Sequence, residues 1–210
     1  MAGNGRKPNL QAVLTGDIVG SSDLSRENRE LLPQKMLEAS EILQSSFSCV
    51  PFQIRIFRGD SWQFIVSAPE KSLRVGLMYR SLIRTSFQDR PVDTRIGIGV
   101  GSINFLPEEN LSSGDGEAFR RSGTALETMV RRRFLDALFP EYWNWATTEL
   151  LREVLLWVDL QAQNWTPGQA AAISGALLGR TQNEIAKQEF KGEITQQAVA
   201  QHLKRGGWSA

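Results

Sequence analysis

Glycines alternate with branched apolar residues in TRIGIGVGSI, and this pattern constrains the fold more than any other feature of the chain. Side chains on a β-strand alternate between the two faces of its sheet. Gly97, Gly99 and Gly101 would therefore share one face, and the isoleucine and valine side chains between them the other. A strand without side chains on one face allows close approach of another backbone. We expect another segment to pack very close to that glycine face.

The segments around this strand alternate between strand and helix periodicities. The apolar run that ends at Gly16 indicates a buried strand, and residues 25–47 carry apolar positions at helical spacing. Alternation over 52–56 and 62–66, with a turn between, indicates a β-hairpin. The remaining segments are a helix after Pro69, the glycine strand at 94–103, a helix at 117–130 and a last strand in RRFLDALF. The order β-α-β-β-α-β-(α)-β fits an α+β, ferredoxin-like sandwich, with helices covering one side of one sheet.

Composition places the chain among ordinary globular proteins. In 210 residues, 24 basic side chains nearly balance 23 acidic ones, so any nucleic-acid contact has to be local. The opening MAGNGRKPNL lacks the apolar core of a signal peptide, and no apolar run approaches the roughly 20 residues of a membrane span. The single cysteine, Cys49, allows no internal disulfide and is expected to be a small core residue. We expect a cytoplasmic protein that does not cross a bilayer.

The character of the chain changes after Pro140. WNWATTELLREVLLWVDLQAQ indicates one long helix, and Thr166, followed by proline, then starts a new one. Thr181 caps a short helix with Glu184 three residues on, and Thr195 caps a third. A short capped helix, a tight turn and a helix with a polar outer face form a helix-turn-helix. The predicted units are a first domain at 1–140, a connecting helix at 141–163 and an all-α helix-turn-helix domain at 164–210.

The last helix carries side chains that suit DNA. Glutamine amides can pair with adenine edges, and lysine and arginine can meet phosphates. The candidate DNA contacts are Thr195, Gln196, Gln197, Gln201, Lys204 and Arg205, with Lys187 and Lys191 as further phosphate contacts. Five basic and three acidic residues follow position 163, so we expect weak binding by a monomer and a need for dimerisation. The alternative is a three-helix packing or protein-interaction module; His202 is expected to be a polar surface or hinge residue.

Two Gly-Asp pairs mark the candidate site of the first domain. Asp17 ends the first strand and Asp60 lies at the hairpin tip, positions that a ferredoxin-like sheet places side by side. With the backbone carbonyl of Ile18, the two carboxylates would hold one or two Mg²⁺ or Mn²⁺ ions, which favour oxygen ligands. Each aspartate taken singly can equally be a turn former. The backbone amides that would cradle phosphates at the start of the next helix belong to Gly20, Ser21 and Ser22.

These motifs resemble those of a known family. TGDIVGSSDL resembles the first metal motif of class III adenylate and guanylate cyclases, FRGDSWQF their hairpin with the second metal aspartate, and RIGIGVGSI their strand of alternating glycines. With GEAFRRSGTALE and the C-terminal WTPGQAAAISGALLGRTQNEIA, the arrangement is similar to the bacterial SatD family. The resemblance implies a nucleotide-binding, class III cyclase-like palm. In it Asp17 and Asp60 match the two metal aspartates, and Arg58 and Gly59 lie at the nucleotide.

The chain departs from the cyclase pattern on the helix after the glycine strand. Cyclases place there an asparagine and an arginine, which orient the ribose and stabilise the phosphate charge of the transition state. Arg120 falls at the asparagine position and Thr124 at the arginine position. Arg120 or Arg121 would supply the missing cation from a shifted register, or each is a solvated charge on an amphipathic helix. Ile56 stands at the place of the base-reading lysine, so the base is not specified.

Three functions are compatible with these features. The first is a regulatory DNA-binding protein whose palm binds a nucleoside triphosphate or a metal-nucleotide, or dimerises, since cyclase-type domains form their sites at a homodimer interface. The second is an enzyme that makes a cyclic or linear nucleotide product, and the third is a structural interaction module. Trp143, Trp145, Trp157 and Trp165 are expected to pack the two domains together, with a dimer interface as the alternative.

Overall fold

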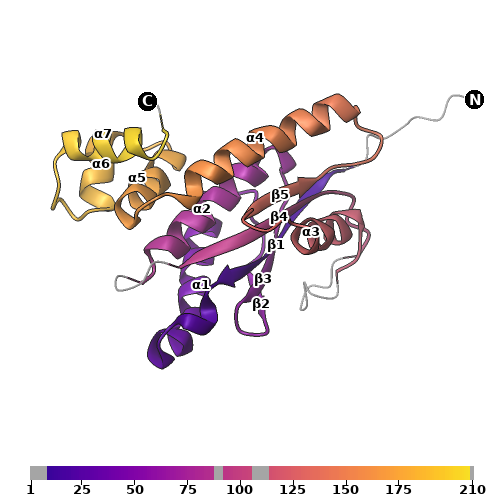
Figure 1. Cartoon of the computed structure of the whole chain (residues 1–210), viewed down its shortest axis with the longest axis horizontal. Helices are drawn as coiled ribbons and strands as arrows, with labels where there is room; N and C mark the ends of the chain where they lie inside the picture. The colour runs from indigo at the N-terminus through magenta and orange to yellow at the C-terminus, as the bar shows by residue number, and fades with distance from the viewer. Residues whose placement is uncertain (1–8, 88–91, 106–113, 209–210) are drawn as a thin grey trace, which may run out of the picture.

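A five-stranded mixed sheet forms the centre of the computed structural model, which describes residues 9–87, 92–105 and 114–208. The two long strands pair antiparallel in the middle of the sheet, and the last strand runs parallel to its neighbour at one edge (Figure 1). The element order predicted from sequence is confirmed. In the spatial order β2-β3-β1-β4-β5, the strands are β2 (Arg55–Phe57), β3 (Ser61–Val66), β1 (Gln11–Val19), β4 (Asp93–Gly101) and β5 (Leu135–Leu138).

The hairpin β2–β3 is shorter than its sequence pattern suggests. Pairing with β3 begins at Arg55, not at Phe52. The backbone N–H of the buried Ile54 donates instead to the Ser40 hydroxyl of the preceding helix, at 2.8 Å. The residues before β2 are therefore tied to that helix and do not extend the sheet.

Helices cover both faces of the sheet. The isoleucine and valine face of β4 packs into the main core with α1 (Arg26–Ser46) and α2 (Ser72–Thr85). The glycine face packs against α3 (Glu117–Glu127), and a Cβ on Gly99 would lie 2.2 Å from the Ala118 carbonyl oxygen. The expected close approach is confirmed. The expectation of helices on one side only is wrong, because α3 returns across the face that the glycines leave bare.

Four further helices follow β5. They are α4 (Trp145–Gln163), α5 (Pro167–Leu177), α6 (Gln182–Gln188) and α7 (Gln196–Arg205). The threonine caps are as predicted: the hydroxyls of Thr166, Thr181 and Thr195 accept backbone N–H bonds at the starts of the last three helices. The first of these packs against α2, where Arg74 donates to the Leu177 carbonyl at 2.7 Å. One continuous apolar core therefore joins the C-terminal helices to the helices that cover the sheet.

A buried ionic network lies where α2, β4 and α4 meet. The guanidinium of Arg80, which is fully buried, donates to both carboxylate oxygens of Asp93 and, at 2.7 Å, to the fully buried Asp159. Arg84 donates to Asp93 and to the Trp165 carbonyl that precedes α5. Carboxylate hydrogen bonds and charges outweigh burial and raise the pKa of Arg80. Two positive and two negative groups therefore compensate one another at the junction with the C-terminal helices.

Two smaller features bear on the sequence expectations. Cys49 is buried, as expected of a core residue. Among the helices of residues 9–208 that the structure describes, none has the length and apolarity required to span a membrane.

Candidate functional site

The two predicted carboxylates lie on neighbouring strands at one end of the sheet. Asp17 of β1 pairs in register with Ser61, the residue that follows Asp60. The Ile18 N–H donates to the Asp60 carbonyl at 3.0 Å, which fastens the hairpin turn to β1. Both aspartates line one open cleft of about 340 Å³, and its remaining walls are Ile18, Val19, Gly20, Ser61, Arg95 and Phe134.

The glycine before Asp17 is required by packing. Gly16 lies inside β1, and a Cβ there would come within 2.2 Å of the Arg95 carbonyl oxygen and 2.4 Å of the buried Trp62 ring. The turn-former alternative therefore fails for Asp17. Asp60 does lie in a turn, where Arg58 and Gly59 adopt positive φ angles of 56° and 86°.

Arg95 holds the first carboxylate. It faces Asp17 directly across the β1–β4 pair, and its Nε donates to Asp17 Oδ1 at 2.8 Å while Nη2 donates to Oδ2. Such a two-pronged arrangement is the strongest geometry for an arginine–carboxylate pair. The hydrogen bond with Asp17 is the largest cause of a raised pKa for Arg95. The Arg95 side chain is 41% exposed and lines the cleft.

The carboxylate oxygens of the cleft are of the type that binds a divalent ion. Their present hydrogen bonds, however, leave neither carboxylate free to do so. Both oxygens of Asp17 accept from Arg95, and Asp60 accepts from the Ser21 hydroxyl at 2.7 Å. A metal ion would have to displace a positively charged side chain from Asp17. Among the residues that the structure describes, histidine, cysteine, aspartate and glutamate nowhere gather in threes around a possible ion.

Of the three residues predicted to bind phosphate through their amides, Gly20 lines this cleft. Gly20 adopts the left-handed conformation and starts a single 3₁₀ turn at Ser21–Asp23. The helix α1 begins only at Arg26, capped by the Ser25 hydroxyl. The amides of residues 20–22 therefore belong to a short turn, not to the N-terminus of α1 as expected. Figure 1 shows α1 starting beyond the end of β1.

The cations proposed on α3 lie outside this cleft. Arg120 is exposed and pairs with Asp115 at 2.6 Å, and with Thr124 it lines a separate cleft. Arg121 donates to the Val100 carbonyl at 2.9 Å and to Glu117. Within one chain, the solvated-charge alternative describes Arg120, and Arg121 braces α3 against β4.

Sequence reasoning missed Arg95. The missing information is the strand register, which pairs it with a residue 78 positions earlier in the chain. One signal was available: Arg95 opens the glycine strand, and the antiparallel neighbour of that end is the end of β1. A basic residue there was a candidate partner for Asp17.

The predicted DNA-contact residues form an exposed surface on α7. Thr195, Gln196, Gln197, Gln201, Lys204 and Arg205 are all exposed, whereas Val199 and Leu203 are buried, as expected. Gln196 also bonds Gln182 of α6, which fixes the two helices at the turn. His202 is half-buried and stacks on Phe190, with ring centroids 5.6 Å apart, so it is a packing residue and not a hinge.

Comparisons with solved structures find nucleotide cyclase cores. The catalytic core of a rhodopsin-guanylyl cyclase with converted specificity, in complex with ATPαS, shares 14% identity at a TM-score of 0.42, covering 59% of this chain and 75% of that one. The adenylyl cyclase CyaB from P. aeruginosa shares 18% identity, with a TM-score of 0.39 over 55% of this chain and 70% of that one. For the guanylyl cyclase Cya2 the identity is 12% and the TM-score 0.35, over 55% and 68%.

No protein-family model and no curated protein matches the chain. The chain itself forms an α+β domain with a five-stranded mixed sheet, followed by a C-terminal helical region.

Proposed function

We propose that this is a DNA-binding regulatory protein whose cyclase-like palm binds a nucleotide without turning it over. The observation that carries the proposal is the Arg95–Asp17 pair. A guanidinium already neutralises the first of the two carboxylates that resemble metal ligands. Thr124 stands where cyclases place the arginine of this helix, and the neighbouring Arg120 lines another cleft and is bound to Asp115. Within one chain, the cleft therefore holds an arginine that can bind phosphate but not the arginines of α3.

Arg95 is the group in this cleft that suits a phosphate. Its planar guanidinium can form parallel hydrogen bonds to phosphate as it does to carboxylate, and the Arg95 side chain lines the cleft and is 41% exposed. Asp17 competes for the same donors, and Asp60 adds a second negative charge nearby. Arg95 can therefore bind either a triphosphate or the Asp17 carboxylate. This competition gives the palm two states that a nucleotide can shift.

Asp17→Asn is expected to increase the affinity of the protein for ATP and GTP in the presence of EDTA by about twofold to fivefold. The change frees Arg95 from a partly exposed ion pair, and such pairs are worth up to about 1 kcal/mol. Isothermal titration calorimetry measures the affinity, with inorganic triphosphate as a second probe. Arg95→Ala is the matched control and is expected to lose binding. Weaker metal-free binding by Asp17→Asn would contradict the role given to Arg95.

The helix-turn-helix would supply the DNA contact. Its outer face presents glutamine amides from Gln197 and Gln201 and cations from Lys204 and Arg205, all exposed. Amides of this kind suit adenine edges, and the cations suit phosphates. Arg180 and Glu189 pair with each other, so they add no net charge to this face.

A combined change of Lys204 and Arg205 to alanine is expected to reduce the dependence of DNA affinity on salt. Each phosphate contact releases about 0.9 counterion, so log K against log[salt] should flatten by about 2 for the double variant. Fluorescence anisotropy with a random-sequence 30-base-pair duplex measures the slope. Arg26→Ala, an exposed arginine of α1 with 94% of its side chain accessible, is the control. An unchanged slope in the double variant would show that Lys204 and Arg205 of α7 do not contact DNA phosphates.

An active nucleotidyl cyclase is the second candidate. The observation that favours it is that Asp17 and Asp60, the two metal-like carboxylates, share one cleft. On this account the wild type forms a product and Asp17→Asn abolishes it, whereas the first proposal expects no product from either protein. The motifs around both aspartates and the capped C-terminal helices also support assignment to the SatD family, as part of the same proposal.

A further inference from the structure

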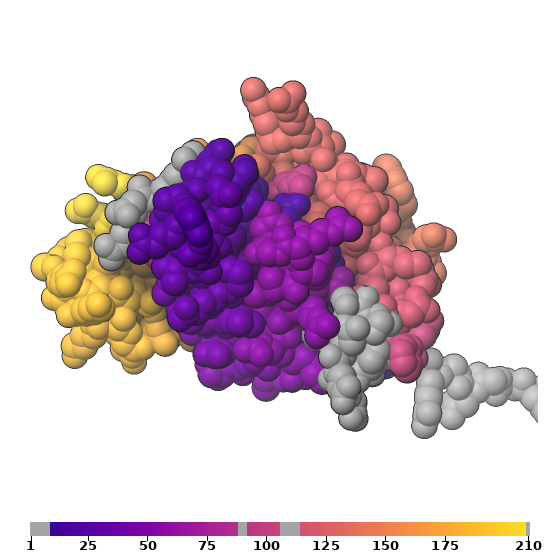
Figure 2. Space-filling model, turned by 90° about the horizontal axis from the view of Figure 1, so that it is seen from below, coloured from indigo at the N-terminus to yellow at the C-terminus, as the bar shows by residue number. Residues whose placement is uncertain are grey.

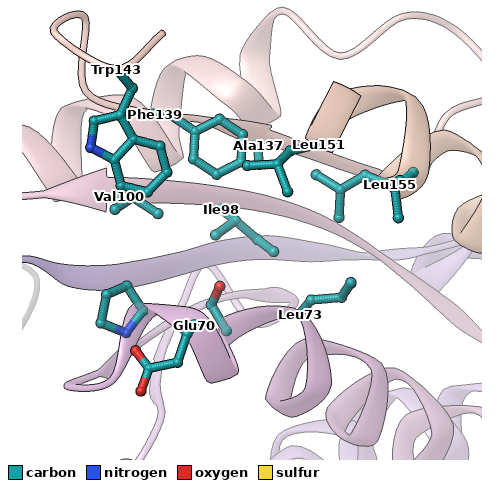
Figure 3. Close-up of a pocket in the computed structure, with 12 residues that line it drawn as sticks. Glu70, Leu73, Ile98, Val100, Ala137, Phe139, Trp143, Leu151 and Leu155 are labelled. Carbon is teal, nitrogen blue, oxygen red and sulfur yellow. The ribbon is translucent and has the colours of Figure 1, made fainter. Parts of the chain in front are cut away.

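A cavity of about 510 Å³ lies between α2 and α4, over the apolar face of β4 (Figure 3). The buried side chains of Ile98 and Val100 form its floor. Leu73 of α2 forms one wall, and Leu151 and Leu155 of α4 form the opposite wall (Figure 3). Sites for small molecules have volumes of roughly 300–1,000 Å³ and mainly apolar walls. The cavity therefore has the size and the lining of a small-molecule site.

This cavity is separate from the candidate nucleotide cleft. Within the part of the chain that the structure describes, the two share no lining residue. Arg95 of the cleft and Ile98 of the cavity point to opposite faces of β4, because side chains alternate along a strand. A ligand in the cavity would therefore leave the cleft unobstructed, whether or not the palm binds a nucleotide.

Trp143 lies at one end of the cavity. It stacks on Phe139 with ring centroids 5.4 Å apart, and both rings line the cavity beside β4 (Figure 3). Of the four tryptophans expected to pack the two domains together, Trp165 is buried, whereas Trp145 and Trp157 are 75% and 69% exposed. Trp143 instead contributes an aromatic wall to the cavity.

The lining offers one buried polar group. Ser72, at the start of α2, is only 7% exposed, and its hydroxyl has no hydrogen-bond partner among the residues that the structure describes. Buried polar groups in proteins are normally hydrogen-bonded, so this hydroxyl is available to a ligand. Glu70, the one charged residue of the lining, is exposed. All other lining residues are apolar.

We propose that the cavity binds an uncharged, mainly apolar small molecule that places one hydrogen-bonding group at Ser72. The apolar walls would cover the body of the ligand, and transfer of apolar surface out of water is favourable. A charged ligand is disfavoured, because an ion removed from water needs a partner of opposite charge. Glu70 lies at the exposed margin of the cavity and would repel an anion.

Helix α4 connects this cavity to the C-terminal helices. It forms one wall of the cavity and is followed directly by α5. The C-terminal helices form one end of the molecule, at the left in Figure 1 and again in the view of Figure 2. A ligand that packs against α4 would therefore contact the element between the palm and the helix-turn-helix, as an effector would.

Fluorescence titration of the full chain with N-phenyl-1-naphthylamine tests the site. This neutral probe has apolar rings and one N–H group, and its emission rises when it leaves water for an apolar site. We expect saturable binding of one probe per chain. The probe 8-anilino-1-naphthalenesulfonate has the same rings and N–H group with an added sulfonate. It is expected to bind about 10-fold more weakly or worse, because the cavity offers its charge no partner.

Leu151→Asp and Leu150→Asp are matched variants of neighbouring residues on α4. Leu151 lines the cavity, whereas Leu150 is 65% exposed and lies outside the lining. Leu151→Asp is expected to weaken binding of the neutral probe by about 10-fold or more, because it places a carboxylate in the apolar cavity. Leu150→Asp is expected to leave the affinity unchanged. Circular dichroism confirms that each variant is folded.

Ser72→Ala tests the polar contact and decides the outcome alone if Leu151→Asp does not fold. The loss of one hydrogen bond is expected to weaken binding of the neutral probe by about twofold to tenfold. The affinity for 1-phenylnaphthalene, which has similar rings but no N–H group, should not change.

Saturable binding that is weakened in Ser72→Ala and in folded Leu151→Asp, and is kept in Leu150→Asp, supports the proposal. Three results would overturn it. They are a wild type without saturable binding, a sulfonate that binds as tightly as the neutral probe, and a neutral-probe affinity that Ser72→Ala leaves unchanged.

Discussion

Gly99→Ala is expected to destabilise the protein by about 3 kcal/mol or more, because overpacking a tight backbone contact costs 1–3 kcal/mol and occasionally more. A Cβ at this position would lie 2.2 Å from both the Ala118 carbonyl oxygen and the Ser122 amide nitrogen. Both atoms belong to the backbone of α3, so no side-chain rotation can relieve the clash. The helix would have to move away from the sheet.

Gly123→Ala is the matched control for this change. Gly123 lies in α3 itself, and a Cβ there would meet nothing within 4 Å. Alanine in a helix is favoured over glycine by about 0.5–1 kcal/mol, so this variant should be slightly more stable than the wild type. Urea unfolding followed by circular dichroism measures both. Equal midpoints for the two variants would show that α3 does not pack on the glycine face.

Asp159→Ala is expected to cost about 3–5 kcal/mol, the usual effect of breaking a buried ion pair from one side. The change removes a carboxylate that accepts from Arg80 at 2.7 Å and from the Phe134 N–H at 2.7 Å. Arg80 would keep Asp93 as a partner but lose half of its compensating charge in a fully buried site. We expect the melting temperature to fall by roughly 10 °C or more.

Glu30→Ala serves as the control for the ionic network. Glu30 pairs with Arg26 on the exposed face of α1, with 66% and 94% of the two side chains accessible. Water screens such a pair, so its loss should leave the melting temperature unchanged. If Asp159→Ala behaved like Glu30→Ala, the network would not stabilise the junction between the sheet and the C-terminal helices.

The elements of the fold could be predicted because their signals are local. Alternating glycines predicted β4, and capping threonines predicted the starts of α5, α6 and α7. The proximity of Asp17 and Asp60 also followed, since the order of strands in such a sheet is restricted.

The features that were missed depend on contacts between distant parts of the chain. Arg95 reaches Asp17 through the register of two strands, and Arg80 reaches Asp159 from 79 residues away. The exposure of Trp157 could not be inferred either, since a tryptophan on an amphipathic helix is more often buried. No periodicity distinguishes a buried apolar face from an exposed one.

The palm and the C-terminal helices share structural connections that would suit regulation. Arg84 binds Asp93, two residues before Arg95, and also the Trp165 carbonyl at the start of the C-terminal module. The ring of Phe134 lines the candidate nucleotide cleft and lies 5.4 Å from the Arg80 guanidinium. The buried network therefore touches both the cleft and the junction.

The central claim, that the palm binds nucleotide without turnover, is tested most directly by product analysis. The purified protein and its Asp17→Asn variant are incubated with the four ribonucleoside triphosphates and Mg²⁺ or Mn²⁺, and mass spectrometry searches for pyrophosphate and cyclic or linear products. We predict no product from either protein, while both still shift duplex DNA in a gel. A product formed by the wild type and absent from Asp17→Asn would contradict the account and identify the protein as a nucleotidyl cyclase or a related enzyme.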